Sequence, residues 1–323
     1  MYRTLSFYKY VRIEDPDALR DELYSTWSDL GVLGRIYVAS EGINAQLSVP
    51  QANFDRFDAS MKARPEFSDV PYKFAVEKGE DASFKKLIIK VKQKIVADGL
   101  DDDSFDVTKT GEYLTAEEFN QYIEDPDAVV VDMRNAYESE IGRFETAVTP
   151  DVDTFREELK VVPNLLADKK DKKIALYCTG GIRCEKASAW LRHNGFEDVK
   201  HLKGGIIDYK HQVEREGLTN RFQGKNFVFD ERLGERIGHD IISHCHLCNN
   251  TKSDTHYHCK SEVCHILFIG CDECVQKMEG YCSLWCNLFD QLPQGIKKYY
   301  ARILNRYFRP AQFKKNRLRS RNA

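Results

Sequence analysis

The sequence predicts a multidomain α/β protein, and three observations support this fold class. Strand-like and helix-like stretches alternate through the first hundred residues, and apolar strands separated by helical segments follow in the second hundred. Eight of the ten cysteines crowd between Cys245 and Cys286, in a stretch with few long apolar runs. We therefore expect two mixed α/β domains, followed by a module whose core is too small to be stable without cross-links such as bound metal ions. The expected parts are a first domain at 1–98, an acidic linker at 99–111, a second domain at 112–217, a cysteine-rich module at 218–290 and a basic tail at 291–323.

The first domain is predicted to be an α+β sandwich. Its strand-like and helical stretches follow the order β-α-β-β-α-β, which is typical of a ferredoxin-like sandwich. That fold hosts many functions, so it says little about activity. The strands are expected at 5–11, 34–49 with a turn at Glu41-Gly42, 72–76 and 87–96, and the helices at 15–30 and 51–63.

The second domain is predicted to hold a mainly parallel sheet with helices on both faces. Apolar strands are expected at 128–133, 173–177 and 199–202, and helical segments separate them. Strands separated in this way build parallel sheets that are covered on both sides. Thr115-Ala116-Glu117-Glu118 is a capping box that starts a helix, and Gly195 suits the end of another.

The chain begins with a polar-interrupted alternating stretch, so no signal peptide is expected. No window approaches the roughly 18 to 20 apolar residues that a membrane span needs. Ten cysteines without a secretory signal favour metal binding or catalysis over a disulfide framework. We therefore expect a cytoplasmic protein without membrane contact, and the sequence indicates no protein partner.

Charge is unevenly distributed along the chain. The formal net charge is −3, yet the segment 291–323 contains ten basic residues and no acidic one. Such a tail favours contact with a polyanion, most simply RNA phosphate. The alternative is a solvated tail that only improves solubility.

Cys178-Thr179-Gly180-Gly181-Ile182-Arg183 is the motif that carries chemistry. It lies between a predicted strand and a predicted helix, where anions bind in open α/β sheets. Amides freed by Gly180 and Gly181 can surround the sulfur, and the helix dipole and Arg183 both favour the thiolate. The motif therefore predicts a low-pKa nucleophile at Cys178. The alternative is a buried thiol at a strand end, beside glycines that merely form a turn.

Cys184 lies just beyond this loop. It could resolve a disulfide or a sulfenic acid on Cys178, or it could be a packed residue in the first turn of the helix.

Eight cysteines form four pairs with metal-ligand spacing. Eight thiolates are the inventory of two closed, tetrahedral, structural zinc sites. Sequential and crossed pairings both stay open, and eight reduced cysteines without metal are the alternative. Five histidines could replace a cysteine: His244, His246, His256, His258 and His265. The four pairs are Cys245/Cys248, Cys259/Cys264, Cys271/Cys274 and Cys282/Cys286.

The loop resembles that of a rhodanese domain, together with Asp132-Met133-Arg134 at the end of the preceding strand and Tyr137-Glu138 after it. Only four residues separate Cys178 from Arg183, which is the short spacing of sulfur-handling loops rather than of the related phosphatases. The resemblance implies a persulfide on Cys178 held by amides of Gly180, Gly181 and Ile182. Supporting or redox roles are expected for Cys184, Asp132 and Arg134.

Over roughly residues 1–290 the chain resembles the bacterial oxygen-dependent tRNA uridine hydroxylases. The resemblance implies that uridine at the wobble position (34) of tRNA is converted to 5-hydroxyuridine, with molecular oxygen as co-substrate. The stretches that carry it are Gly34-Arg35-Ile36-Tyr37-Val38-Ala39-Ser40-Glu41-Gly42-Ile43-Asn44, Asp132-Met133-Arg134-Asn135, Glu140-Ile141-Gly142, the Cys178 loop through Cys184-Glu185, His258-Cys259 and Cys264-His265-Ile266-Leu267-Phe268-Ile269-Gly270-Cys271.

Two hypotheses describe how Cys178 would act in such a reaction. The thiolate could add to uridine C6 and make C5 electron-rich, or a persulfide on Cys178 could supply reducing equivalents. A base of the anticodon loop must be splayed out to be read, and aromatic residues of the first domain are candidates to stack on it.

Two rival functions remain. A sulfurtransferase would use the same catalytic residues to move sulfane sulfur, but it would not need both flanking domains and a basic tail. A non-catalytic RNA-binding zinc module is a second alternative, and the intact Cys178 and Arg183 argue against it.

Overall fold

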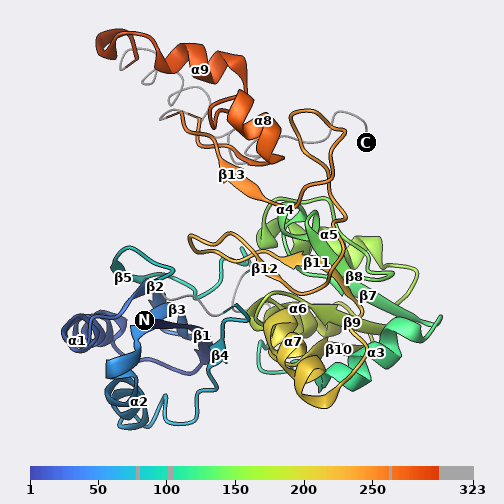
Figure 1. Ribbon diagram of the computed structural model, residues 1–323. Helices are drawn as coiled ribbons and strands as arrows, with labels where there is room; N and C mark the ends of the chain where they lie inside the picture. Colours follow the sequence, from blue (N-terminus) through green and yellow to red (C-terminus); the bar gives the residue numbers. More distant parts are fainter. Residues whose placement is uncertain (78–80, 101–104, 262–263, 298–323) are drawn as a thin grey trace.

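The computed structural model describes residues 1–77, 81–100, 105–261 and 264–297. The N-terminal sheet and the central sheet lie side by side, and the segment that carries α8 and α9 projects away from both (Figure 1). Within the described ranges, every helix is too short or too polar to cross a membrane.

The N-terminal domain has the predicted ferredoxin-like topology. Its sheet has the order β4-β1-β3-β2-β5, in which the first four strands are antiparallel neighbours and β5 adds parallel to β2. The order 4-1-3-2 arises because β3 inserts between β1 and β2. The elements are β1 (Tyr2–Tyr10), α1 (Pro16–Asp29), β2 (Leu33–Ala39), β3 (Gly42–Pro50), a 3₁₀ turn η1 (Gln51–Asn53), α2 (Phe54–Lys62), β4 (Lys73–Phe74) and β5 (Leu87–Val91).

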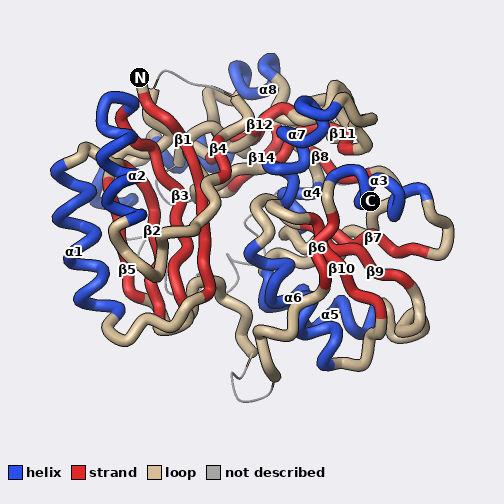
Figure 2. Tube along the Cα trace, turned by 90° about the horizontal axis from the view of Figure 1, so that it is seen from below, coloured by secondary structure: helices blue, strands red, loops and turns tan. Residues whose placement is uncertain are grey.

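Both helices of this domain cover one face of its sheet, as Figure 2 shows. Trp27 of α1 and Phe57 of α2 are fully buried, with ring centroids 5.5 Å apart. Along β1, Leu5 and Phe7 point into that core. Because side chains alternate along a strand, the intervening residues of β1, among them Tyr8, face the other way. That second face looks toward the central domain.

The central domain contains the predicted parallel sheet, in the order β6-β10-β9-β7. Along β9, Ile174 and Leu176 pack with α5 and α6, whereas Ala175 and Tyr177 pack with α3 and α7. Helices therefore cover both faces, as expected. The elements are β6 (Glu112–Leu114), α3 (Ala116–Glu124), β7 (Ala128–Asp132), α4 (Ala136–Ser139), β8 (Gly142–Phe144), α5 (Phe155–Leu165), β9 (Lys173–Tyr177), α6 (Ile182–His193), β10 (Asp198–Leu202) and α7 (Gly205–Glu216).

Two sequence signals at helix ends are confirmed. Thr115 and Glu118 form the expected capping box at the start of α3. Gly195 follows the end of α6 with φ of +82°, a conformation that glycine adopts without steric cost.

The segment beyond α7 is joined to the central domain by strand pairing. β11 (Phe222–Asn226) pairs antiparallel with β8 and with β12 (Glu235–Arg236). Farther along, β13 (His256–His258) pairs with β14 (Leu267–Ile269), and two short helices follow, α8 (Asp272–Lys277) and α9 (Leu284–Asp290).

Two of the predicted parts fall partly outside the described residues. The acidic linker at 99–111 includes 101–104, and most of the basic tail at 291–323 lies beyond residue 297. The expected domain boundaries stay predictions.

A buried ion pair joins the N-terminal segment to α6. The Lys186 ammonium donates to Glu41 Oε2 at 2.9 Å and also pairs with Asp98. The side chains of Lys186 and Asp98 are only 2% and 1% exposed. Asp98 also accepts from Lys94 at 2.8 Å. The strand predicted at 87–96 ends at Val91 in the structure. The chain beyond Val91 contains Lys94 and Asp98, which take part in this ion-pair cluster.

Replacing Lys186 with methionine should destabilise this junction. The substitution removes the charged partner of Glu41 and leaves the buried Asp98 with Lys94 alone, so the free energy of unfolding should fall by roughly 3 kcal/mol. Urea unfolding followed by tryptophan fluorescence measures the loss. The matched control is Lys62→Met, whose pair with Asp58 is exposed and should cost less than about 0.5 kcal/mol. Equal unfolding midpoints for the two variants would contradict the prediction.

Candidate active site

Cys178 lies where strand β9 gives way to helix α6. Its side chain is fully buried, and the Gly181 N–H donates to its Sγ at 3.1 Å. Gly181 is the residue before the first turn of α6 and has φ of +97°, which favours glycine. The predicted position of the cysteine, at the carboxyl end of a parallel strand and the start of a helix, is thus the observed one.

The start of α7 holds the same loop from the other side. Backbone N–H groups of Ile206 and Ile207 donate to the carbonyls of Cys178 and Thr179, at 3.0 and 3.2 Å. A Cβ on Gly205 would lie 2.5 Å from the Cys178 carbonyl oxygen. Only a residue without a side chain allows this close approach. The sequence analysis did not predict this contact, although the adjacent glycines Gly204 and Gly205 are the residue type that permits a close approach of two backbones.

The surroundings of Cys178 favour its thiolate. Burial on its own raises the pKa of this thiol, but the Cys184 thiol, the Arg183 charge and the backbone N–H groups of Cys184 and Gly181 outweigh burial and lower the pKa to about 6. Hydrogen bonds to a charged form and a nearby opposite charge both stabilise that form. The sulfur is therefore mostly ionised at neutral pH.

Cys184 is the neighbour that contributes most to this effect. It is fully buried in the first turn of α6, and burial together with the Cys178 charge raises its pKa well above the usual thiol value. Cys184 therefore stays protonated beside the Cys178 thiolate. Both cysteines are free thiols.

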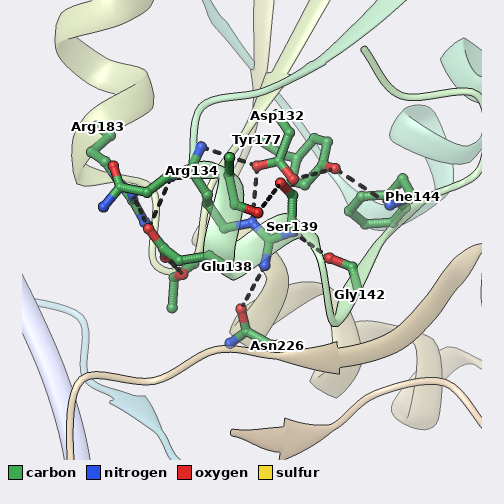
Figure 3. Close-up of polar contacts among 12 residues, drawn as sticks. Asp132, Arg134, Glu138, Ser139, Gly142, Phe144, Tyr177, Arg183 and Asn226 are labelled. Atoms are coloured by element: carbon green, nitrogen blue, oxygen red, sulfur yellow. Dashed lines mark hydrogen bonds and ion pairs between the residues drawn. The ribbon is translucent and has the colours of Figure 1, made fainter. Parts of the chain in front are cut away.

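Arg183 is held by a carboxylate that the sequence analysis did not single out as a site residue. Its guanidinium donates to the two Glu138 oxygens at 2.7 and 2.9 Å, and Figure 3 shows the two side chains directed at each other. The Glu138 side chain is fully buried. The signal that could have found it is the capping box of Asn135 and Glu138 at the start of α4.

Asp132 and Arg134 brace the sheet behind the loop. Arg134 donates to both Asp132 oxygens, at 2.9 and 2.7 Å, and to the Gly142 carbonyl at 2.6 Å (Figure 3). The Tyr177 hydroxyl also donates to Asp132, at 2.7 Å. Neither Asp132 nor Arg134 lines the cavity described next. Their contacts therefore fit a role in holding the end of strand β7 in place behind the loop.

A cavity of about 960 Å³ opens on the loop. Cys178, Thr179, Gly180, Ile182 and Arg183 all line it. Its other walls come from the N-terminal sheet, from residues 227–233 after β11, and from two histidines of the cysteine-rich segment, His258 and His265. A Cβ on Gly180 would meet open space, so the loop backbone is accessible from the cavity. This volume is near the upper end of small-molecule sites.

Aromatic residues of β1 bring the N-terminal sheet against α6. The Tyr8 hydroxyl donates to Glu185 Oε1 at 3.0 Å, and the Tyr10 hydroxyl donates to the Ile182 carbonyl at 3.4 Å. Tyr113 reaches the same Glu185 oxygen at 2.6 Å. The second face of the N-terminal sheet therefore forms one wall of the site, which no local sequence pattern indicated.

Lys73 places a cation in this wall. Its ammonium lies 4.2 Å from the centroid of the Tyr8 ring. Burial lowers the pKa of Lys73 to about 8, although the negative charges of Cys178, Asp208 and Glu185 act in the opposite direction. Arg35 and Lys86 line the same cavity. In the described part of the chain, none of these three cations forms an ion pair.

The eight cysteines of the C-terminal segment lie in two groups of four. In each group, all four sulfur atoms lie within 4.8 Å of one another. The pairing is crossed, which the sequence analysis left open. Within the described residues none of the five histidines joins either group, and His246 instead contacts Glu140 at 2.7 Å. One group is Cys245, Cys248, Cys271 and Cys274, and the other is Cys259, Cys264, Cys282 and Cys286.

The sulfur–sulfur distances suit a tetrahedral metal ion. Cys282 Sγ lies 3.6 Å from the sulfurs of both Cys264 and Cys286. Zinc–sulfur bonds of about 2.3 Å in a tetrahedron place the sulfurs about 3.8 Å apart. Both groups could therefore hold a metal ion, and four thiolates are a donor set typical of structural zinc.

Three stretches of the chain match known protein families. Residues 2–95 match the family described as UPF0176 acylphosphatase like domain, and residues 115–212 match the Rhodanese-like domain. Residues 223–287 match the family described as Rhodanase C-terminal. Among solved structures, a rhodanese-like domain protein from Staphylococcus aureus is 24% identical, with a TM-score of 0.26, and the match covers 30% of this chain and 90% of that one.

Relatives of much higher similarity carry a functional name. A protein of Leptospira interrogans named tRNA uridine(34) hydroxylase is 56% identical, over 91% of this chain and 80% of the relative. A protein of Yersinia enterocolitica with the same name is 53% identical, over 90% of this chain and 83% of the relative. By this similarity, and with the three parts of its fold in agreement, the chain belongs to the tRNA uridine(34) hydroxylase family.

Proposed function

We propose that this protein hydroxylates C5 of uridine 34 in tRNA, with dioxygen as the oxidant and Cys178 as the reacting group. The observation that carries the proposal is a cysteine that accepts a hydrogen bond from the Gly181 N–H at the floor of a large cavity walled by all three parts of the chain. The relatives named above support uridine 34 as the target. A tRNA substrate supports our proposal that the protein acts in the cytoplasm.

The cavity suits a nucleotide that has left the anticodon stack. Enzymes that act on a base take it out of the stack into a pocket and read it by stacking and by polar contacts. Tyr8 and Tyr37 offer aromatic side chains in the N-terminal wall. Arg35, Lys73 and Lys86 offer positive charge to the phosphates beside the base. Tyr8 and Tyr37 are therefore our proposal for the aromatic contact expected from the first domain.

The thiolate of Cys178 suits addition to the uracil ring. In that step its sulfur forms a bond to C6, and electron density moves to C5, which takes up dioxygen as a peroxide. A two-electron reductant of the thiol class then cleaves the O–O bond, which leaves the hydroxyl group on C5 and releases the second oxygen as water. Loss of the C5 proton and departure of the Cys178 thiolate restore the double bond. The Gly181 N–H, the Cys184 thiol and the Arg183 charge stabilise the thiolate as it departs. Glu138 keeps the Arg183 guanidinium in place by its two hydrogen bonds.

Sulfur transfer is the second candidate function. It is favoured by the Gly181 N–H that donates to Cys178 and by the match of residues 115–212 to the Rhodanese-like domain. It does not account for a cavity walled by the N-terminal sheet and the cysteine-rich segment.

Two structural zinc ions are proposed for the two cysteine groups. A site closed by four thiolates leaves no position for water, so it stabilises a fold rather than catalysing. The surrounding core is small and is built mainly around Phe268 and Tyr281. Zinc would hold this segment, and with it His258 and His265, at the rim of the cavity.

Cys178→Ser should abolish hydroxylation. Unmodified tRNA incubated in air with the wild-type protein should gain one oxygen on uridine 34, as measured by nucleoside mass spectrometry. The variant, and the wild type without dioxygen, should leave uridine unchanged, because a serine hydroxyl is not ionised near neutral pH. Lys62→Ala, on the exposed side of α2, is the matched control. Transfer of sulfur from thiosulfate to cyanide without any added oxygen would favour the second candidate instead.

Alkylation of Cys178 should follow a pKa near 6. The thiolate form predominates above the pKa, so at pH 7 about nine-tenths of Cys178 is reactive, against about 3% for an ordinary thiol with a pKa of 8.5. Iodoacetamide labelling across pH, read by peptide mass spectrometry, measures the midpoint. In Cys184→Ala the midpoint should rise, because the neighbouring thiol that favours the charge is gone. A wild-type midpoint near 8.5 would show that Cys178 is not activated.

Cys259→Ser should lower the zinc content from about two ions per chain to about one. Elemental analysis of the purified protein measures this change, and a chelator should lower the melting temperature of the wild type in proportion to the zinc removed. Cys184→Ser, which lies outside both groups, is the control and should keep both ions. A wild type that carries no zinc, or a variant that keeps two ions, would exclude the assignment.

A further inference from the structure

We propose that the N-terminal sheet binds a second nucleotide of the tRNA, one that neighbours the reacting uridine, by stacking its base on Tyr37 and contacting the edge of that base with Gln46. This inference rests on the proposed hydroxylase function and extends it from the reacting nucleotide to the one beside it. The N-terminal domain thereby takes part in choosing the substrate.

The strand register places two rows of side chains across the face of this sheet that looks toward the central domain (Figure 2). Along β1, β2 and β3, residues packed into the domain core alternate with residues that stay partly or fully exposed, and the exposed set points to the other face. The first row is Tyr8, Asn44 and Tyr37, and the second row is Lys73, Ser6, Gln46 and Arg35. All seven residues line the cavity that contains Cys178.

Tyr8 is the member of the first row that lies beside the cysteine loop. A Cβ on Gly181 would lie 2.9 Å from the Tyr8 hydroxyl oxygen, and the Gly181 N–H donates to the Cys178 sulfur. The Tyr8 hydroxyl also donates to Glu185 on α6. The base that reacts with Cys178 is therefore the one nearest to Tyr8.

Tyr37 lies farther along the same row and is available to another base. Neighbouring strands are about 4.8 Å apart, so equivalent positions two strands apart are separated by about 10 Å. The Asn44 side chain stands between the two tyrosines on the same face, so a base stacked on one ring is out of stacking reach of the other. RNA-recognition motifs, which also use the face of a four-stranded sheet, stack two or three bases on its aromatic residues.

Gln46 offers a polar contact to a base on Tyr37. It follows Asn44 by two positions on β3 and is therefore the diagonal neighbour of Tyr37 across the strand pair, a distance that long side chains span. The Asn44 amide donates to the Ile95 carbonyl at 3.2 Å, whereas no hydrogen bond within the described residues occupies the Gln46 amide. An amide presents a donor beside an acceptor, which is how glutamine reads the edge of a base.

The charge around Tyr37 is complementary to RNA. On β5, Lys90 lies opposite Tyr37 in the register, and the Lys92 ammonium lies 5.9 Å from the centroid of the Tyr37 ring. Among the described residues neither lysine forms an ion pair, so both can contact the phosphates on either side of a stacked base. The charged residues that the N-terminal domain contributes to the cavity are all cations, namely Arg35, Lys73, Lys85 and Lys86.

Loss of single bases from the RNA tests the proposal. Anticodon stem-loop RNAs are made with an abasic residue at one or the other position beside the reacting uridine, and fluorescence anisotropy measures their dissociation constants with the full-length protein. At one of these positions the abasic residue should weaken binding to the wild type roughly five- to 100-fold, the effect of losing one stacked base. The same abasic residue should weaken binding to Tyr37→Ala less than about twofold, because the ring that the base contacts is already gone.

Two further variants separate stacking from a structural role of Tyr37. Tyr37→Phe keeps the ring and should respond to the abasic RNAs as the wild type does. Tyr24→Ala, at an exposed position of α1 on the opposite face of the sheet, is the matched control and should also respond as the wild type does. If Tyr37 only supports the fold, Tyr37→Ala would weaken binding of the intact and the abasic RNAs by the same factor, and the proposal would be overturned.

The contact from Gln46 has a test of its own. The four natural bases are placed in turn at the position that couples to Tyr37. The wild type should bind its preferred base about fivefold or more tightly than its worst, and Gln46→Ala should reduce this ratio to less than about twofold. An unchanged ratio in Gln46→Ala would overturn the part of the proposal assigned to Gln46.

The second subsite and the hydroxylase function fail in different ways. Nucleoside mass spectrometry on the same RNAs reports hydroxylation independently of binding. Coupling between Tyr37 and one base in RNA that is never hydroxylated would support the subsite and remove the hydroxylase function. Hydroxylated RNA in which neither neighbouring base couples to Tyr37 would remove the subsite and leave the hydroxylase function intact.

Discussion

The negative charge on the Cys178 sulfur is a buried charge, and the site is built around the groups that stabilise it. A charge removed from water is costly unless it is paired and hydrogen-bonded. The loop supplies the Gly181 N–H, and the first turn of α6 supplies Arg183 and Cys184. Arg183 is itself buried and would be as costly without Glu138. The reactive sulfur therefore depends on a chain of contacts that ends on α4, forty residues earlier in the sequence.

Helix α6 connects this charge network to the N-terminal domain. The N-terminal end of the helix follows the cysteine loop. On its side, Glu185 accepts a hydrogen bond from Tyr8 of the N-terminal domain. Lys186 forms ion pairs with Glu41 and Asp98 of the same domain. The same helix thus fixes both the nucleophile and the wall that faces it. This arrangement explains how a ferredoxin-like sandwich can complete a site whose reactive atom lies elsewhere.

Local patterns were enough to predict much of this structure. The strand before Cys178, the helix after it and the eight cysteines all follow from short-range spacing. The contacts of Glu138 and Gly205 with the loop could not be predicted, because each joins segments far apart in the chain. The crossed order of the cysteines escaped prediction for the same reason, since spacing identifies pairs of ligands but not which pairs meet.

That crossed order constrains how the C-terminal segment can assemble on the ribosome. The first group is complete when Cys274 has been made, before Cys282 and Cys286 exist. Its closure would enclose Cys259 and Cys264 within a loop whose ends are already tied. Cys282 and Cys286 must then bind the same metal ion as Cys259 and Cys264, which lie on that closed loop. The two groups therefore share one stretch of chain. Neither half could be cut from the chain as an independent finger.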